Sequence, residues 1–231
     1  MPLRIYPEKV TATIRRIKHV DGVALVRTDT KIHFNDEDTA LGTVFMTNPG
    51  SYKMSKHRDW DLFIKGEGNI DFITGEDSPD ATMRSLIGVV RTAYELVGIS
   101  KPRGYLSIYN ISSLIETDGN KINNYHNKVV NLLTANEINP SILCEQEASE
   151  KDHFYNQCKN SSFIIMGFLK NAFKEDVQRL KGWGEEHKQK LVFAADKEGD
   201  YTHPFSWLPK PPLKQQAINR LVDVIRTVDR I

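Results

Sequence analysis

Four short apolar segments alternate with stretches of helical periodicity, and this alternation strongly limits the folds open to the chain. The segments are residues 42–46, 105–109, 162–167 and 190–194. Short apolar strands separated by helices predict a parallel sheet covered on both faces. We therefore expect an α/β protein, with three α/β/α layers around a central, mainly parallel four-stranded sheet.

Residues 1–38 and 211–231 flank this core. Two strand-like runs, Thr11–Val20 and Val23–Arg27, surround Asp21-Gly22, a pair typical of a two-residue hairpin turn. We expect one domain: a hairpin extension (1–38), a core (40–210) and a C-terminal helix (211–231). Helices are expected at 125–133, 147–158, 171–181 and 215–228, with another starting at Ser78-Pro79-Asp80 and ending at Gly98.

The charge is balanced overall but uneven along the chain. The 231 residues carry 31 basic and 30 acidic side chains, a formal net charge of +1. This balance gives no broad electrostatic mark of a nucleic-acid-binding protein. Residues 35–80 hold ten acidic and four basic residues. From Asp59 to Asp80 this segment is glycine-containing and lacks clean periodicity, so it predicts a long loop.

Several site classes are absent from the sequence. No apolar run is long enough to span a membrane, and Met1-Pro2-Leu3-Arg4 lacks a secretory apolar region, so a cytoplasmic location is expected. Cys144 and Cys158 are too few for a disulfide framework or a four-ligand zinc site. The histidines are scattered, and no phosphate-binding glycine loop occurs. We expect no cofactor and no metal.

Polar residues follow the predicted strands, at the edge where open α/β sheets bind ligands. Asn48, Asn110 and His203 are the side chains with suitable chemistry, and Gly167 ends a further strand. An amide can hold a water or a polar ligand edge, and an imidazole can donate to an oxygen that gains negative charge. Such a set suits cleavage of an N-glycosidic bond, in which the base leaves as an anion. The structural alternative is that each residue caps a turn or a strand end.

The ordered motifs resemble the uracil-DNA glycosylase superfamily. Met46–Ser51 resembles the Asn-Pro-Gly first motif of its mismatch-specific branch, and Tyr105–Asn110 resembles the strand that ends in a base-reading Asn. Phe163–Gly167 resembles the apolar strand that ends in Gly, and His203–Ser206 resembles the late His-Pro motif. The chain is also similar to a bacterial domain family of unknown function with an Asn-Pro-Ser turn and a late His-Pro. The resemblance covers about residues 40–210.

The resemblance implies specific roles. Asn48 would position the attacking water or the base, His203 would stabilise the departing base oxygen or contact the flanking phosphate, and Asn110 would read the flipped base. The remaining implied contacts are with the substrate base (Gly50, Ser51, Tyr52, Trp60 and Phe63), with the duplex as a wedge loop (Phe205, Ser206, Trp207 and Leu208) and with phosphates (Lys53, Lys56, Arg58, Lys210 and Lys214).

The motifs also depart from the family. The first motif lacks an acidic residue, His-Pro is followed by Phe205-Ser206-Trp207, and the iron–sulfur cysteines of some branches are missing, so no metal cluster is expected. We expect a monofunctional DNA glycosylase that leaves an abasic site. Its hypothesised base is a larger modified pyrimidine, such as a hydroxymethylated or glucosylated cytosine of phage DNA, whose sugar Asp59, Trp60 and Asp61 would contact. This would be an antiviral defence activity.

Two alternatives stay open. One is a non-catalytic DNA- or nucleotide-binding protein on the same fold, and the other is a hydrolase of free nucleosides or nucleotides. The expected partner is DNA, without a membrane. The oligomeric state is open, with a monomer as the expectation.

Overall fold

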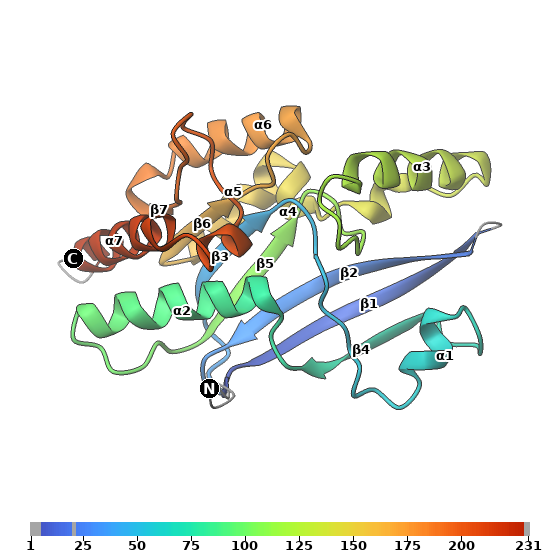
Figure 1. The fold of residues 1–231 in the computed structure, drawn as a ribbon, viewed down its shortest axis with the longest axis horizontal. Helices are drawn as coiled ribbons and strands as arrows, with labels where there is room; N and C mark the ends of the chain where they lie inside the picture. Colours follow the sequence, from blue (N-terminus) through green and yellow to red (C-terminus); the bar gives the residue numbers. More distant parts are fainter. Residues whose placement is uncertain (1–5, 20–21, 229–231) are drawn as a thin grey trace.

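A seven-stranded mixed sheet forms the centre of the computed structural model, which describes residues 6–19 and 22–228 (Figure 1). The strands lie in the order β4-β1-β2-β5-β3-β6-β7. Their bounds are β1 (Lys9–His19), β2 (Gly22–His33), β3 (Ala40–Met46), β4 (Phe72–Asp77), β5 (Tyr105–Asn110), β6 (Phe163–Gly167) and β7 (Leu191–Val192).

The predicted α/β class is confirmed, but the predicted four-stranded sheet is wrong. Strands β1, β2 and β4 join the same sheet through three antiparallel pairings: β1–β2, β1–β4 and β2–β5. The parallel pairings are β5–β3, β3–β6 and β6–β7. The expected hairpin therefore extends the sheet, because β2 hydrogen-bonds to β5. Of the predicted turn pair Asp21-Gly22, Asp21 lies outside the described residues, whereas Gly22 is the first residue of β2 and pairs with His19.

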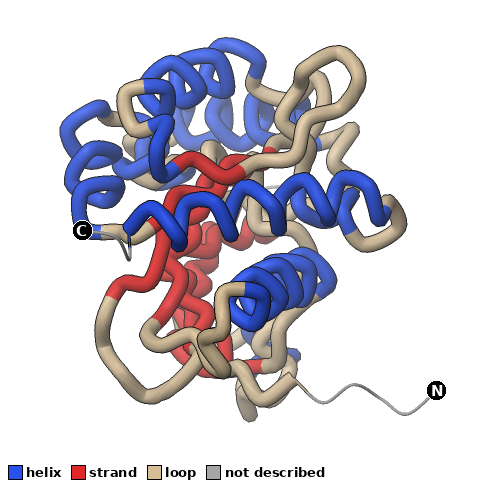
Figure 2. Tube along the Cα trace, turned by 90° about the vertical axis from the view of Figure 1, so that its left-hand side faces the viewer, coloured by secondary structure: helices blue, strands red, loops and turns tan. Residues whose placement is uncertain are grey.

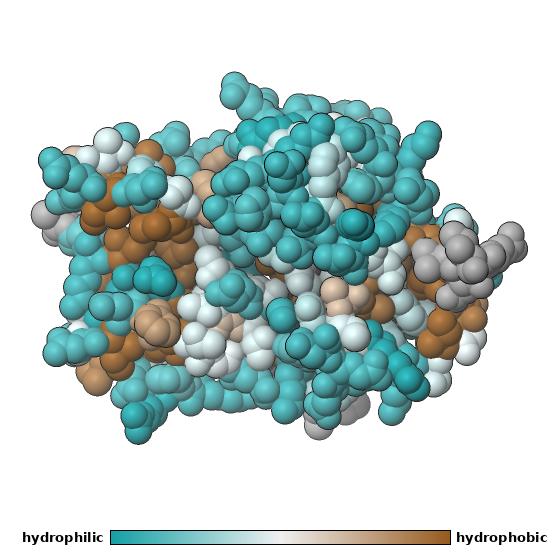
Figure 3. Space-filling model, turned by 180° about the vertical axis from the view of Figure 1, so that it is seen from behind, coloured by the Kyte–Doolittle hydropathy of each residue, from teal (hydrophilic) through white to brown (hydrophobic). Residues whose placement is uncertain are grey.

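Helices cover both faces of the sheet (Figure 2). They are α1 (Trp60–Ile64), α2 (Ala81–Leu96), α3 (Ile122–Ala135), α4 (Gln146–Ser149), α5 (Lys151–Asn160), α6 (Lys174–Glu185) and α7 (Pro211–Val228), with 3-10 turns η1 (Pro140–Leu143), η2 (Lys188–Lys190) and η3 (Pro204–Trp207). None of the described helices combines the length and apolar character that crossing a bilayer requires. Seen from behind, polar residues cover the middle of the surface and hydrophobic residues gather towards both ends (Figure 3).

The alternation of side chains along β3 explains the two-sided core. Val44 and Met46 pack in the cluster that contains α2 and α7, whereas Phe45 packs in the cluster that contains α5 and α6. Successive strand residues point to opposite faces, so a strand buried on both sides must be apolar throughout. A third cluster joins α3 to the β1–β2 part of the sheet.

The acidic segment is not the predicted loop. It contains α1 and the edge strand β4, which pairs with β1 from Val10↔Asp77 to Arg15↔Phe72. Ile73 is buried between the exposed Phe72 and Thr74, a short alternation that pairing with β1 stabilises. Pairing with a distant strand thus overrides the weak local pattern.

Several predicted helix boundaries also change: the expected helix 147–158 is divided into α4 and α5, and α7 begins at Pro211 and not at residue 215. Helix α2 begins two residues later than expected: Asp80, not Ser78, is its N-cap, and the Asp80 carboxylate accepts the Met83 N–H at 2.9 Å. Helix α6 continues through the expected break to Glu185. A Cβ at Gly184 would lie 2.7 Å from the Met166 Cε, so this glycine lets the helix approach β6 closely.

Candidate functional site

The two core strands that follow β3 lie on opposite sides of it in the sheet, β5 on one side and β6 on the other. From β3 the crossover through α2 leads to β5 on one side, and from β5 the chain returns to β6 on the other side of β3. Ligands of open α/β sheets bind at such a switch point, beyond the carboxyl ends of the strands. The two segments that leave β3 and β6 meet there, since the Leu169 N–H donates to the Thr47 Oγ1 at 2.8 Å.

A cavity of about 410 Å³ opens at this edge, beyond β6 and β7. Its walls are the segment after β6, one face of α6, the segment 196–203 after β7 and the start of the C-terminal region. Its lining includes Lys170, Asn171, Lys174, Gln178, Lys181, Asp196, Asp200, Thr202, His203, Ser206 and Lys210.

His203 is a buried polar residue in the lining of this cavity. It is 8% exposed, and its Nδ1 accepts the Phe205 N–H at 3.3 Å, where it caps η3. The neutral ring must then carry its hydrogen on Nε2, which is buried without a partner among the described residues. Burial lowers the pKa of His203 to about 4, so at neutral pH the ring is an uncharged hydrogen-bond donor.

Gly167 fixes the position of the His203 turn against β6. A Cβ there would lie 2.7 Å from the Pro204 Cδ and 2.8 Å from the Thr202 carbonyl oxygen. The segment also pairs with the chain after β6 through the bridge Phe168↔Thr202. The absence of a side chain on Gly167 therefore lets the His-Pro turn lie directly on the strand end.

We expect Gly167→Ala to lower the free energy of unfolding by about 1–3 kcal/mol, because the new methyl group overlaps backbone and proline atoms. Gly182→Ala is the matched control. A Cβ at Gly182 in α6 meets nothing within 4 Å, so the substitution should stabilise the protein by about 0.5–1 kcal/mol. Chemical denaturation measures both; equal effects of the two substitutions would contradict the close packing of Gly167.

Asn48 lies at the predicted strand end but outside the His203 cavity. It is 4% exposed, and its Nδ2 donates to the Glu116 carbonyl at 2.8 Å. Its Oδ1 accepts no hydrogen bond from a described residue. The following Gly50 has φ +68°, which makes the Asn-Pro-Gly turn possible, and Ser51 is exposed.

Asn110 is completely buried and is held by Glu145. Both its backbone N–H, at 2.7 Å, and its Nδ2, at 3.3 Å, donate to the Glu145 Oε2. Its Oδ1 is buried without a partner in the described structure. Burial raises the pKa of Glu145 to about 8, although the Asn110 hydrogen bonds oppose the shift. The predicted base-reading amide thus faces protein groups and does not line the His203 cavity.

The aromatic residues predicted to stack on the base belong to the core. Tyr52 is 1% exposed, donates to the Val10 carbonyl at 2.9 Å and lies under the Arg27 guanidinium, which is 5.1 Å from its ring centroid. Trp60 and Phe63 are also buried, on α1. Because α1 lies beside β4 at the opposite end of the sheet from β6 and β7, neither Trp60 nor the neighbouring Asp59 and Asp61 serves this cavity.

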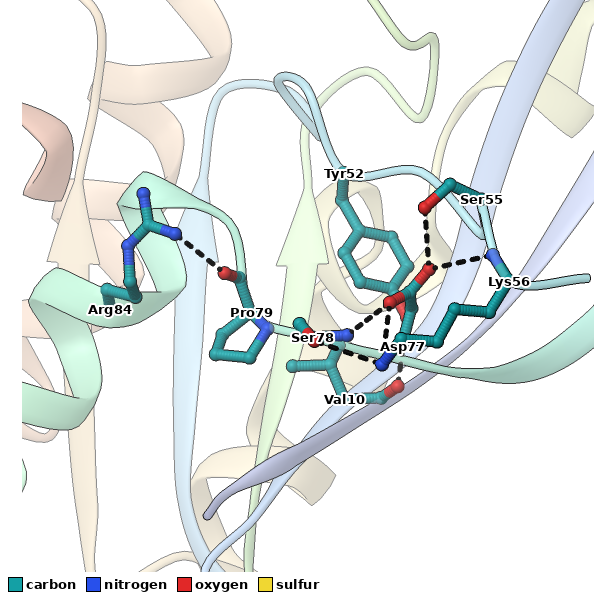
Figure 4. A network of polar contacts seen from close by, with 8 residues as sticks. All are labelled: Val10, Tyr52, Ser55, Lys56, Asp77, Ser78, Pro79 and Arg84. Atoms are coloured by element: carbon teal, nitrogen blue, oxygen red, sulfur yellow. Dashed lines mark hydrogen bonds and ion pairs between the residues drawn. The ribbon is translucent and has the colours of Figure 1, made fainter. Parts of the chain in front are cut away.

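The basic residues after the first motif also lie away from the cavity. Lys56 is bound to Asp77, with its Nζ 3.4 Å from the carboxylate (Figure 4). Burial opposes ionisation of Asp77, but hydrogen bonds from Ser78, Lys56 and Ser55 together hold its pKa below the usual value. Arg58 pairs with Asp59 at 3.2 Å, and Lys53 is exposed. Two of these three basic residues, Lys56 and Arg58, are therefore already paired within the protein.

The predicted wedge loop divides into exposed and buried residues. Phe205 is 53% and Leu208 42% exposed, whereas Ser206 and Lys210 line the cavity. Trp207 is fully buried, and its Nε1 donates to the Thr202 Oγ1 at 3.0 Å. A DNA contact does not fit this burial, and Trp207 instead anchors the turn that carries His203.

Several residues that line the cavity were not predicted from the sequence as site residues. Lys174, Gln178 and Lys181 share one face of α6, and their i, i+4 and i+7 spacing is the signal that could have identified them. Outside the cavity, the buried residues Glu145 and Arg27 were also not predicted. No local sequence pattern identifies them, because their burial depends on distant strands. Carboxylates of Asp196, Glu198 and Asp200 also lie within 4.8 Å of one another at the rim, where Lys170 contacts Asp196 and Glu198.

No family model matches the sequence, and comparisons with curated proteins and with solved structures gave no significant match.

Proposed function

We propose that this chain is a DNA glycosylase that cleaves the N-glycosidic bond of a flipped base and leaves an abasic site. The observation that supports it is the unpartnered Nε2–H of His203, a buried residue that lines the cavity beyond β6 and β7 together with four lysines. A donor without a protein acceptor is costly to bury, so its retention indicates a ligand acceptor.

In the proposed reaction a water oxygen bonds to C1′ while the C1′–N bond breaks. The electron pair of that bond passes to the base, and charge collects on a carbonyl oxygen. A neutral imidazole already held by the Phe205 N–H can donate to this oxygen without reorganising. The attacking water releases its proton to solvent or to the base, and Asn48, which lies outside the cavity, is not assigned to this water.

The substrate proposal keeps a modified pyrimidine but changes the residues that would recognise it. The cavity volume lies in the range of about 300–1,000 Å³ typical of small-molecule sites. Asp196 and Asp200 provide acceptors at its wall, in place of Asp59 and Asp61. Exposed Phe205 and Leu208 would fill the gap left by the flipped base.

One observation favours the alternative of a non-catalytic nucleotide-binding protein. The amides of Asn48 and Asn110 both donate to protein groups, and neither residue lines the cavity. On this alternative His203 would only bind the base or a phosphate.

Incubation of the protein with uracil-containing, mismatched and phage-modified DNA, followed by alkaline cleavage at abasic sites, tests the proposal. Release of a base from one of these DNAs is the expected result. Binding without strand cleavage on every DNA would support the non-catalytic alternative. Release from free nucleosides alone would support the hydrolase alternative.

A further inference from the structure

One face of α6 lines the cavity along two turns. Lys174, Val177, Gln178 and Lys181 all contribute to its wall, at i, i+3, i+4 and i+7, and are called the α6 stripe below. Residues with this spacing lie one above another on a helix. The other side of α6 packs inward, since Leu180 and Gly184 are buried.

The lysines around the cavity differ in their partners. Lys170 contacts the carboxylates of Asp196 and Glu198, so its charge is neutralised locally. Lys174, Lys181 and Lys210 form no ion pair with any residue that the structure describes. Lys181 contacts the Tyr201 ring, with its Nζ 4.6 Å from the centroid, a contact that involves no carboxylate. Positive charge therefore collects on the α6 side of the cavity and at Lys210.

We propose that the α6 stripe binds the phosphates of a nucleic-acid strand, so that the substrate of this cavity is a strand and not a free nucleoside. The inference rests on the proposed function for the identity of the base in the cavity, but strand binding can be measured without base release. Unpaired lysines and His203, whose Nε2–H is unpartnered, line the same cavity. A ligand with a neutral acceptor at its centre and anionic groups on its flanks would complement them.

The separation of Lys174 and Lys181 fits phosphates about three steps apart on one strand. Seven residues of α-helix rise about 10.5 Å from Lys174 to Lys181. Phosphates of one duplex strand follow at about 3.4 Å along the axis, so the two lysines span about three steps. A free nucleoside carries no phosphate and would leave both lysines without an anionic partner.

The test measures binding of the full chain to a fluorescent oligonucleotide over a series of salt concentrations. Each lost phosphate contact reduces the slope of log K against log salt by about 0.7 on single-stranded and about 0.9 on duplex DNA. We expect Lys174→Gln with Lys181→Gln to reduce the slope by about 1.4–1.8. Lys65→Gln, at an exposed lysine after α1 and outside the cavity lining, is the matched control and should leave the slope unchanged.

An unchanged slope in the double variant, or equal changes in the variant and the control, would overturn the proposed strand contact. Equal affinity of the wild-type chain for a mononucleotide and for the oligonucleotide would also overturn it. Base release is assayed separately. Strand binding through the stripe without any base release would refute the glycosylase and keep the inference, whereas base release unaffected by the double variant would keep the glycosylase and refute the stripe.

Discussion

Replacing His203 with Ala should reduce base release by about 10²–10³-fold, the usual effect of deleting one donor to a developing oxyanion. The imidazole is a buried donor of the cavity lining whose hydrogen has no acceptor in the described structure, so on this proposal its loss removes an interaction made with the ligand. His203→Gln is the informative second variant. Its amide can donate from a similar position, so it should retain part of the activity. Single-turnover measurement of abasic sites gives the rates.

The pH profile separates this role from that of a general acid. The pKa of His203 is lowered to about 4 by burial, so the ring stays neutral as pH falls through 6.5. A neutral donor therefore predicts no loss of His203-dependent rate between pH 8 and pH 5. A rate that follows protonation near pH 6.5, or normal base release by a correctly folded His203→Ala variant, would rule out the proposed donor.

Replacing Glu145 with Gln should stabilise the protein at alkaline pH and have little effect in acid. The pKa of Glu145 is raised to about 8 by burial, from an ordinary value of 4.5. In the folded state the carboxyl keeps its proton up to about pH 8, whereas in the unfolded state it loses the proton above 4.5. The stability that this difference contributes is fully present below pH 4.5 and is lost as pH rises through 8.

The expected gain from Glu145→Gln at pH 8.5 relative to pH 5 is on the order of 4 kcal/mol. Gln keeps an oxygen that can accept both Asn110 N–H groups, so the hydrogen bonds at 2.7 and 3.3 Å are conserved in kind. Urea denaturation of variant and wild type at both pH values measures the difference. The lowered pKa of His203 acts in the opposite sense, because it reduces stability as pH falls below 6.5, but it is common to both proteins and cancels. A pH-independent difference would show that Glu145 is ionised in the folded protein.

Sequence patterns located the strands that carry the site. The apolar run 42–46 lies within β3, 105–109 within β5, and 190–194 contains the short strand β7. Periodicity and turn residues act between near neighbours, so these elements could be identified without a structure. The same reasoning placed Gly167 at the end of β6, but His203, predicted to follow a strand end, is the N-cap of η3, and the contact of its turn with Gly167 was not predicted.

Only the tertiary structure decided which of these residues share a cavity. Asn110 donates to Glu145, 35 residues along the chain. Tyr52 donates to the Val10 carbonyl and lies under the Arg27 guanidinium. The hairpin and the acidic segment become strands of the central sheet because β2 pairs with β5 and β4 with β1. Burial, hydrogen-bond partners and pKa values depend on residues that are distant in sequence and adjacent in space, so local patterns cannot assign them. The alternation of strands and helices was determined by the sequence itself, whereas the joining of His203 with the lysines of α6 required the folded chain.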